Sequence, residues 1–369
     1  MLTLSLQDAK DLIVGVSILS TGGGGSFEKG IRLAEEDYGN GLRYCLRTKD
    51  EIDDDGLFTS PYFCGAVGPE DNTNDPYEQY EKLPGLETVA AVRALERFLG
   101  EYIAGLVSIE YGGMNTAVAL STAARLGKPA VDADAAGRAV PDLQFSTYYT
   151  ANQPIAPLAV ATAIGECGVF EKIADDFRAE ALVRALAVVS GNMVGMTDHP
   201  TRGRDLKNAV IWGALSYAQS VGYARRKANE AGDDPIAAII AAAGGFLLFS
   251  GTVDGDSEWK NEAGFTPGTI YIQGKDRFAR QDLKIWYKNE NLMSWKNGEV
   301  YVTCPDLICV VDTKTGCPLL NPGCKDGMEV TVLGFPAPDV WRQGRGLSIL
   351  NPSFFGFAET WTPIETLMK

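Results

Sequence analysis

The chain of 369 residues contains one histidine, His199. This scarcity excludes a metal site built from several histidines, and it excludes any Ser-His-Asp or Cys-His catalytic arrangement that does not use His199. We expect Asp198-His199-Pro200 to lie in a loop. A lone histidine in a loop is usually an ordinary surface residue, and a functional role is the alternative.

Positive charge is also scarce, because 33 lysines and arginines stand against 48 aspartates and glutamates, for a net charge of −15. This acidic balance argues against nucleic acid or an anionic membrane as a partner. No apolar run is long enough to span a membrane, since the longest, around residues 236–249, is interrupted by Gly244 and Gly245. No basic segment followed by an apolar one opens the chain. These absences predict a cytoplasmic protein.

The seven cysteines form no C-x-x-C pair, so we expect reduced thiols in a cytosolic protein. Four of them cluster at Cys304, Cys309, Cys317 and Cys324. A zinc site is the alternative there, although the spacing matches no familiar ligand pattern. Pro305 restricts Cys304 to extended geometry, but no neighbour in the sequence favours a reactive thiolate.

A run of four glycines follows Thr21 and ends at Ser26, between an apolar stretch and an expected helix. Glycine loses much backbone entropy on folding, so such a run is typical of a close backbone approach or of positive φ angles. We expect the N–H groups of Gly22, Gly23, Gly24 and Gly25 to bind an anion at the helix start, with a flexible turn as the alternative. The run matches neither G-x-G-x-x-G nor a P-loop with its lysine, so no nucleotide is expected.

Hydrophobic periodicity predicts the elements of the first part of the chain. Helices are expected over 3–19, 27–37, 86–99 and 116–126, strands over 57–67, 102–109 and 130–131, and a surface loop over 70–76. The strand, loop, helix and strand between residues 102 and 131 imply a right-handed parallel crossover.

The rest of the chain changes character twice. Residues 155–244 are expected to be mostly helical, with 177–188 and 206–231 the strongest candidates. Short β segments are expected over 249–254, 269–273, 283–287, 300–303, 307–312 and 329–335. The predicted fold class is an α/β N-terminal domain with a mostly parallel sheet over 1–165, followed over 166–369 by a helical segment and a β-rich α+β C-terminal domain.

Carboxylates gather where the two parallel strands end. Glu110 follows one strand, and Asp132 and Asp134 follow the next, so all three are expected at the same sheet edge. Alternate residues of an extended segment share a face, and a carboxylate pair can bind a cation or perform general acid–base chemistry. A solvated, hydrogen-bonded loop is the alternative.

Two further segments are candidates for binding. Gly113 and Asn115 belong to the loop after Glu110, where Asn115 either contacts a ligand or caps the following helix. Asn289 and Glu290 follow an aromatic strand, where a turn is the ordinary interpretation and a site role the alternative.

Four stretches resemble the S-methyl-thiohydantoin desulfurase family, which is encoded beside hydantoinases. They are Leu19–Gly25, Glu110–Asn115, Val131–Gln144, and a discontinuous stretch from Asn289–Leu292 through Cys304–Ile308 to Phe354–Gly356. The resemblance covers nearly the whole chain. The family usually has an aspartate directly after the glycine run, where this chain has Ser26, so substrate and activity are open at that position.

The resemblance implies two domains and hydrolytic desulfurisation of a thiohydantoin ring, which yields a hydantoin for a hydantoinase. A different cyclic amide or ureide hydrolase is one alternative, and a non-catalytic partner of a hydantoinase-type enzyme is another. We also expect a homo-oligomer.

A mechanism follows from the chemistry of attack by water on the ring carbon that bears sulfur. Asp132 or Asp134 is the hypothetical base, or the pair holds a divalent metal instead. Arg138 and the glycine N–H groups would hold an oxyanion or a substrate carboxylate. Glu110 would bind the ring, and the remaining binding candidates are Thr21, Gly22, Gly23, Gly24, Gly25, Gly113, Asn115, Asn289 and Glu290.

Overall fold

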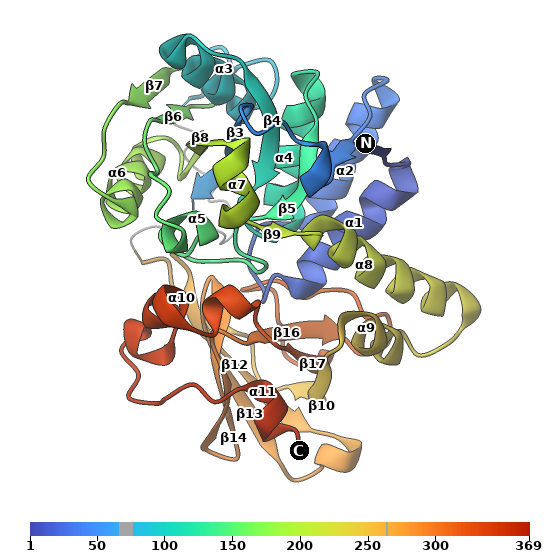
Figure 1. Cartoon of the computed structure of the whole chain (residues 1–369). Helices are drawn as coiled ribbons and strands as arrows, with labels where there is room; N and C mark the ends of the chain where they lie inside the picture. Colours follow the sequence, from blue (N-terminus) through green and yellow to red (C-terminus); the bar gives the residue numbers. More distant parts are fainter. Residues whose placement is uncertain (66–76, 263–264) are drawn as a thin grey trace.

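The computed structural model describes residues 1–65, 77–262 and 265–369, which form two bodies, each built on one sheet (Figure 1). The surface loop expected over 70–76 and the end of the strand expected over 57–67 lie outside the described residues. The first body, in blue to yellow-green, lies above the second, in orange to red.

The sheet of the first body is mixed, with parallel strands at its centre. Its strands are β1 (Leu2–Thr3), β2 (Cys45–Arg47), β3 (Leu57–Gly65), β4 (Ile103–Ser108), β5 (Ala130–Asp134), β6 (Leu158–Ala161), β7 (Cys167–Phe170), β8 (Met193–Arg202) and β9 (Ile211–Trp212). The order is β1-β2-β5-β4-β3-β8-β6-β7, with β9 on β5. The pairs β2–β5, β5–β4 and β4–β3 are parallel, which confirms the crossover predicted between β4 and β5.

Helices cover both faces of this sheet. They are α1 (Leu6–Leu19), α2 (Phe27–Gly39), α3 (Glu87–Leu99), α4 (Gly113–Arg125), α5 (Thr147–Thr150), α6 (Asp176–Val189), α7 (Gly203–Ala209) and α8 (Ala214–Ala231), with a 3₁₀ turn η1 (Lys49–Glu51). A further helix, α9 (Pro235–Ala243), packs on α8. Ser5 caps α1 in a capping box with Asp8, and Ser26 caps α2 by accepting a hydrogen bond from the Lys29 N–H. Because these side chains satisfy free backbone N–H groups, α1 begins directly after Ser5 and α2 directly after Ser26.

The expectation of a mostly helical segment over 155–244 is wrong in part. The strands β6, β7 and β8 lie there, and β9 separates α7 from α8 within the helix expected over 206–231. β8 is buried along most of its length between β3 and β6. Its residues Met193–Arg202 mix glycine, proline and polar side chains, so the sequence shows no hydrophobic pattern of a strand. The strand is buried because neighbouring strands and helices cover it.

The second body is built on an antiparallel sheet of order β15-β14-β13-β12-β10-β17-β16, with β11 on β12. Its elements are β10 (Phe246–Val253), β11 (Glu258–Trp259), β12 (Pro267–Gly274), η2 (Asp276–Phe278), β13 (Asp282–Lys288), β14 (Glu290–Lys296), β15 (Glu299–Thr303), β16 (Leu307–Asp312), β17 (Glu329–Phe335), η3 (Asp339–Trp341), α10 (Gly344–Ile349), η4 (Pro352–Phe355) and α11 (Ile364–Leu367). All six β segments expected there are strands, and the predicted fold class is confirmed.

The two bodies share one apolar core. Buried residues of α1 and α8, such as Val16 and Ala218, belong to the same cluster as Leu307 of β16 and Phe335 of β17. The two bodies therefore pack tightly against each other and are not joined only by a linker. Within the described residues, no helix is long and apolar enough to cross a membrane.

Candidate functional site

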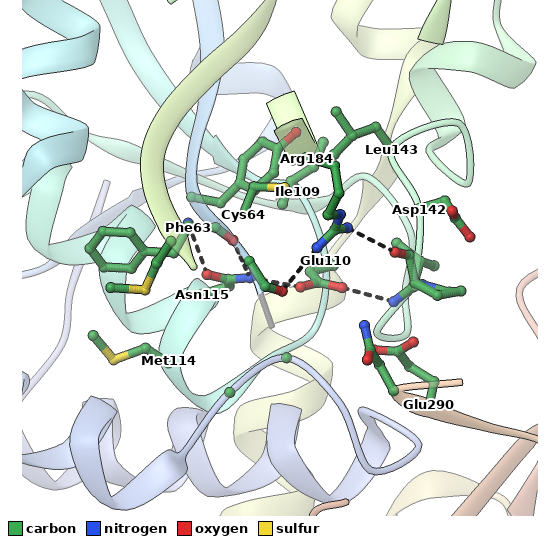
Figure 2. Close-up of a pocket in the computed structure, with 18 of the residues that line it drawn as sticks. Phe63, Cys64, Ile109, Glu110, Met114, Asn115, Asp142, Leu143, Arg184 and Glu290 are labelled. Carbon is green, nitrogen blue, oxygen red and sulfur yellow. Dashed lines mark hydrogen bonds between the residues drawn. The ribbon is translucent and has the colours of Figure 1, made fainter. Parts of the chain in front are cut away.

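A cavity of about 460 Å³ opens between the two bodies at the carboxyl end of β4 (Figure 2). A volume of this order suits a small-molecule ligand. Its lining residues are Gly24, Gly25, Ser26, Lys29, Tyr62, Phe63, Cys64, Gly65, Ile109, Glu110, Met114, Asn115, Val140, Pro141, Asp142, Leu143, Ser146, Arg184, Met193, Asn289 and Glu290. Most come from the first body, and Asn289 and Glu290 come from the second.

Glu110 is held at the cavity by two hydrogen bonds. Its Oε1 accepts from Asn115 Nδ2 at 2.7 Å, and its Oε2 accepts from the Val140 N–H at 2.8 Å. Burial raises the pKa of Glu110 to about 7, against these two stabilising donors, and the negative charge of Asp134 adds to the rise. A carboxyl that titrates near neutrality inside a cavity is suited to general base catalysis.

Glu290 brings a second carboxyl group from the start of β14 and is 2% exposed. Burial raises its pKa well above the usual value, and the nearby Glu110 raises it further. Among the residues that the structure describes, none donates a hydrogen bond to Glu290 Oε2. A buried oxygen at a cavity without a partner is costly unless a ligand or water satisfies it.

Asn115 orients Glu110 rather than capping the helix. The cap of α4 is Gly112, so the alternative in which Asn115 caps this helix is wrong. Asn115 Oδ1 accepts from the Phe63 N–H at 3.1 Å, which fixes the amide so that its Nδ2 points to Glu110 (Figure 2). This arrangement ties the end of β3 to the candidate base.

Two charged residues that line the cavity, Arg184 and Asp142, form ion pairs with residues behind the wall. Arg184 Nε donates to Glu180 Oε1 at 2.8 Å, and its terminal nitrogens donate to the carbonyls of Gly65 and Pro141. Asp142 pairs with Lys288 of β13, at 3.1 Å between Oδ2 and Nζ. Arg184 and Asp142 therefore brace the wall, and the Asp142–Lys288 pair joins the two bodies beside Glu290.

The glycine run forms a junction between the two bodies. A Cβ on Gly24 would lie 2.2 Å from Gly112 Cα, and one on Gly23 would lie 2.0 Å from Glu290 Oε1. Gly24 also has φ +73°, which favours glycine. The N–H of Gly23 donates to the Ser20 carbonyl, while the Gly22 carbonyl accepts from Asn321. The run thus lets the backbone approach both Glu290 and the loop that carries Glu110.

Only some of the site residues predicted from the sequence line the cavity. Gly24, Gly25, Glu110, Asn115, Asn289 and Glu290 line the cavity, whereas Thr21, Gly22, Gly23, Gly113, Asp132, Asp134 and Arg138 do not. Glu290 could be found from the sequence only as part of a polar triplet after an aromatic strand. The lining residues Tyr62, Cys64 and Arg184 carry no signal that sequence reasoning used, and Asp142 was included only as part of the stretch Val131–Gln144.

Asp132 and Asp134 lie inside β5 and have separate partners. Asp132 accepts from the N–H and the hydroxyl of Ser216, at 2.9 and 2.5 Å. Asp134 Oδ1 accepts from the N–H groups of Ala136 and Gly137, and burial raises the pKa of Asp134 to about 7. Within the described parts of the chain, no group of three or more His, Cys, Asp or Glu side chains is arranged to hold a metal ion.

Arg138 is fully buried between the two bodies. Its guanidinium donates to the Pro305 carbonyl at 2.6 Å and to the Asn291 carbonyl and Thr21 hydroxyl at 3.4 Å. Burial lowers the pKa of Arg138, and the acidic groups nearby, Glu290 among them, oppose this. Arg138 therefore acts on the site through its charge and through the position of β14, without lining the cavity.

His199 differs from expectation, whereas the cysteines agree with it. His199 lies in β8 and is fully buried, so its placement in a loop is wrong. Burial raises the pKa of the Cys304 thiol to about 12, in keeping with an unreactive cysteine. All seven cysteines are free thiols.

These features define a two-domain α/β protein with a buried carboxyl pair in the cavity between its bodies. Comparison with known protein families identifies the family. The S-Me-THD-like N-terminal domain matches residues 7–172, and the S-Me-THD-like C-terminal domain matches residues 174–364. The chain belongs to this family, and the resemblance to S-methyl-thiohydantoin desulfurases is confirmed. The family boundary near 173 precedes the last strands of the first sheet, β8 and β9.

One solved structure shows the same fold. It is the X-ray crystal structure of a protein from Chromobacterium violaceum, which is 23% identical and superposes with a TM-score of 0.78 over 99% of this chain and 100% of that one. Among curated proteins, none matches this chain.

Proposed function

We propose that this protein hydrolyses a thiohydantoin-type ring and releases its sulfur, with Glu110 as general base and Glu290 as general acid. The observation that carries the proposal is the pair itself: two buried carboxyl groups face one cavity, and one oxygen of Glu290 has no partner among the described residues. Membership of the S-Me-THD-like family supports a thiohydantoin-related substrate.

The different surroundings of the two carboxyl groups support their different roles. Glu110 accepts two hydrogen bonds, which favour its charged form, and its pKa lies near 7. Glu290 lacks a donor on Oε2, and burial raises its pKa, so in this proposal Glu290 carries the proton of the pair. One ionised and one protonated carboxyl group form the acid–base pair that the reaction needs.

The proposed reaction on an S-methyl-thiohydantoin balances in protons and atoms. Water attacks the ring carbon that bears sulfur, and Glu110 takes one proton as the C–O bond forms. The C–S bond then breaks, and methanethiol leaves with the proton that Glu290 donates. The ring remains as the hydroxyimine tautomer of a hydantoin, whose proton moves to the ring nitrogen. Glu110 returns its proton to Glu290 and restores the starting state.

Asn115 and the cavity walls position the ring in this proposal. Asn115 fixes the Glu110 carboxylate, while Phe63 and Met114 form an apolar wall on the other side of the cavity (Figure 2). Methionine sulfur and an aromatic ring make favourable contacts with a methylthio group. Asp132, Asp134 and Arg138 support the site from outside the cavity and touch no substrate in this mechanism.

A substrate panel tests the proposal. Purified protein is incubated with S-methyl-thiohydantoins, thiohydantoins, hydantoins and dihydrouracil, and released thiol, sulfide and ring-opened product are measured. Thiol or sulfide release from the sulfur-bearing rings, with the hydantoin left intact, is the expected result. Ring opening instead would favour another cyclic amide hydrolase. Co-purification with a hydantoinase-type enzyme and no turnover on any ring would favour an accessory role.

A further inference from the structure

A second buried cluster, outside the carboxyl pair, surrounds the single histidine. His199 Nδ1 lies 3.0 Å from Asp198 Oδ1, and His199 Nε2 lies 3.3 Å from Asp176 Oδ1 at the start of α6. The ring stacks on Tyr148 of α5, with 4.6 Å between centroids. Ionised carboxylates only accept hydrogen bonds, so this geometry favours a proton on both ring nitrogens, which makes the ring an imidazolium.

This cluster reaches the wall of the cavity. Asp198 Oδ2 accepts a hydrogen bond from the Tyr62 hydroxyl at 2.6 Å, and the Tyr62 side chain lines the cavity. Tyr62 lies on β3, which pairs with β8 beside it (Figure 1). A continuous path of hydrogen bonds therefore runs from Asp176 through His199 and Asp198 to Tyr62.

The backbone at His199 is held in an unusual conformation. Its φ of +46° is rare for a residue with a side chain. The His199 N–H donates to the Ile155 carbonyl at 3.1 Å, and the Thr201 hydroxyl donates to the His199 carbonyl at 2.8 Å. Strained residues of this kind persist where the surroundings fix them, and here the strain brings the ring between two carboxylates.

We propose that His199 is a positioning residue of the cavity: its imidazolium fixes Asp198, and Asp198 fixes the Tyr62 wall. The inference rests on the proposed function only in taking this cavity as the binding site. A neutral ring has a single N–H donor, so loss of the proton leaves one carboxylate without its partner and frees Tyr62 to shift.

The protonation of His199 sets the pH range of this effect. Burial alone lowers the pKa of His199, but Asp198 and Asp176 outweigh it and raise the pKa to about 9. The charged and titratable groups around the ring are Asp198 on β8, Asp176 on α6, Tyr148 on α5 and, through Asp198, Tyr62 on β3. A raised histidine pKa stabilises the folded state fully below about pH 6.5, and this contribution is lost as the pH rises through about 9.

Because the chain has one histidine, NMR of protein labelled with ¹⁵N-histidine observes this ring alone. We expect two protonated ring nitrogens at pH 7.5 and a titration near pH 9. The ring carbon signal of Tyr62, assigned by its loss in Tyr62→Phe, should move with the same midpoint. A neutral single tautomer at pH 7.5, or a Tyr62 signal that ignores the His199 titration, would overturn the proposal. Neither measurement needs a substrate.

Two matched variants separate positioning from general stability. Tyr62→Phe removes the hydroxyl that Asp198 accepts from, and the imidazolium midpoint should rise because the Asp198 charge is then less satisfied. Tyr44→Phe removes a similar buried hydrogen bond, 2.9 Å from Asp37, and Tyr44 does not line the cavity. It should leave the His199 midpoint unchanged. Equal shifts in both variants would contradict a specific path.

The last measurement is the binding of N3-methylhydantoin as a function of pH. This compound has no imide proton, so its own ionisation does not contribute to the pH dependence. Its Kd should rise about tenfold with a midpoint near pH 9 in the wild type, and this step should be absent in Tyr62→Phe. A step near pH 7 alone would report Glu110 and count against the role of His199. Turnover without the step near pH 9 would leave the proposed function intact and refute this inference. If His199 and Tyr62 titrate together as expected but the protein has no turnover, this inference stands and the proposed function is refuted.

Discussion

Two pairs of buried carboxyl groups lie near the same edge of the first sheet and differ in whether they line the cavity. Asp132 and Asp134 accept hydrogen bonds from Ser216 and from backbone N–H groups of the first body. Glu110 and Glu290 come from different bodies and face a cavity. Unpaired oxygens do not separate the two pairs, because Asp134 Oδ2, like Glu290 Oε2, has no hydrogen-bond partner among the described residues. Access separates them: a buried carboxyl group at a strand end is structural when protein encloses it. It is available for chemistry when the cavity is its remaining neighbour.

The largest effect on turnover is expected from Glu110→Gln. The amide keeps the shape of the side chain but cannot take a proton from water, so kcat/KM should fall roughly 100- to 10,000-fold. Steady-state thiol release measures the effect, with circular dichroism to check folding. Activity within a few-fold of the wild type would remove Glu110 from the role of base.

Glu290→Gln should have the next largest effect. The introduced amide is uncharged, as protonated Glu290 is, and could donate a hydrogen bond, but it cannot deliver a proton to the leaving sulfur. We expect a loss in kcat of roughly 100-fold. Substrates with a more acidic thiol leaving group need less help from an acid, so the variant should recover on them. Equal losses on all leaving groups would argue against an acid role.

The pH dependence of kcat/KM should follow the raised pKa of Glu110. The base is active when ionised, so kcat/KM should rise about tenfold per pH unit up to about pH 7 and then level off. This rising limb should be missing from the residual activity of Glu110→Gln. A profile flat between pH 5 and 8 in the wild type would contradict the assignment.

Asp132→Asn should have the smallest effect on turnover. Asp132 lies outside the cavity, so activity should stay within about twofold of the wild type. Loss of the charged hydrogen bonds to Ser216 should lower the free energy of unfolding by about 1–3 kcal/mol, measured by urea denaturation. A large loss of turnover with unchanged stability would reverse the comparison and make the β5 pair catalytic.

Local signals in the sequence predicted much of the fold. The alternation from β4 to β5 through α4 identified the parallel crossover, and every β segment expected after residue 245 is a strand. The segment around β8 failed, because its burial depends on contacts with β3 and β6 rather than on its own pattern. The helix expected over 206–231 is interrupted near its start, where β9 pairs with β5, and is helical from residue 214 onward.

The candidate site was predicted in part. Glu110, Asn115 and the end of the glycine run were found because strand ends and glycine runs mark where backbone and ligands meet. Asn289 and Glu290 were named with a turn as the ordinary interpretation. The chain does turn at Asn289, which has φ +65° between the paired strands β13 and β14, and Glu290 opens β14 and lines the cavity. The departure at Ser26 is mild in structural terms, since serine caps α2 and aspartate is an equally good cap.

The sequence by itself determined the fold class, the family, and the placement of Glu110 at the end of a parallel strand. These follow from short-range patterns that the chain carries whatever its final packing. Tertiary packing placed Glu110 and Glu290 at one cavity, kept Asp132 and Asp134 outside it, and buried His199 between two carboxylates. The reason is physical: charge, burial and hydrogen-bond partners come from residues distant in the chain, and folding alone brings them together.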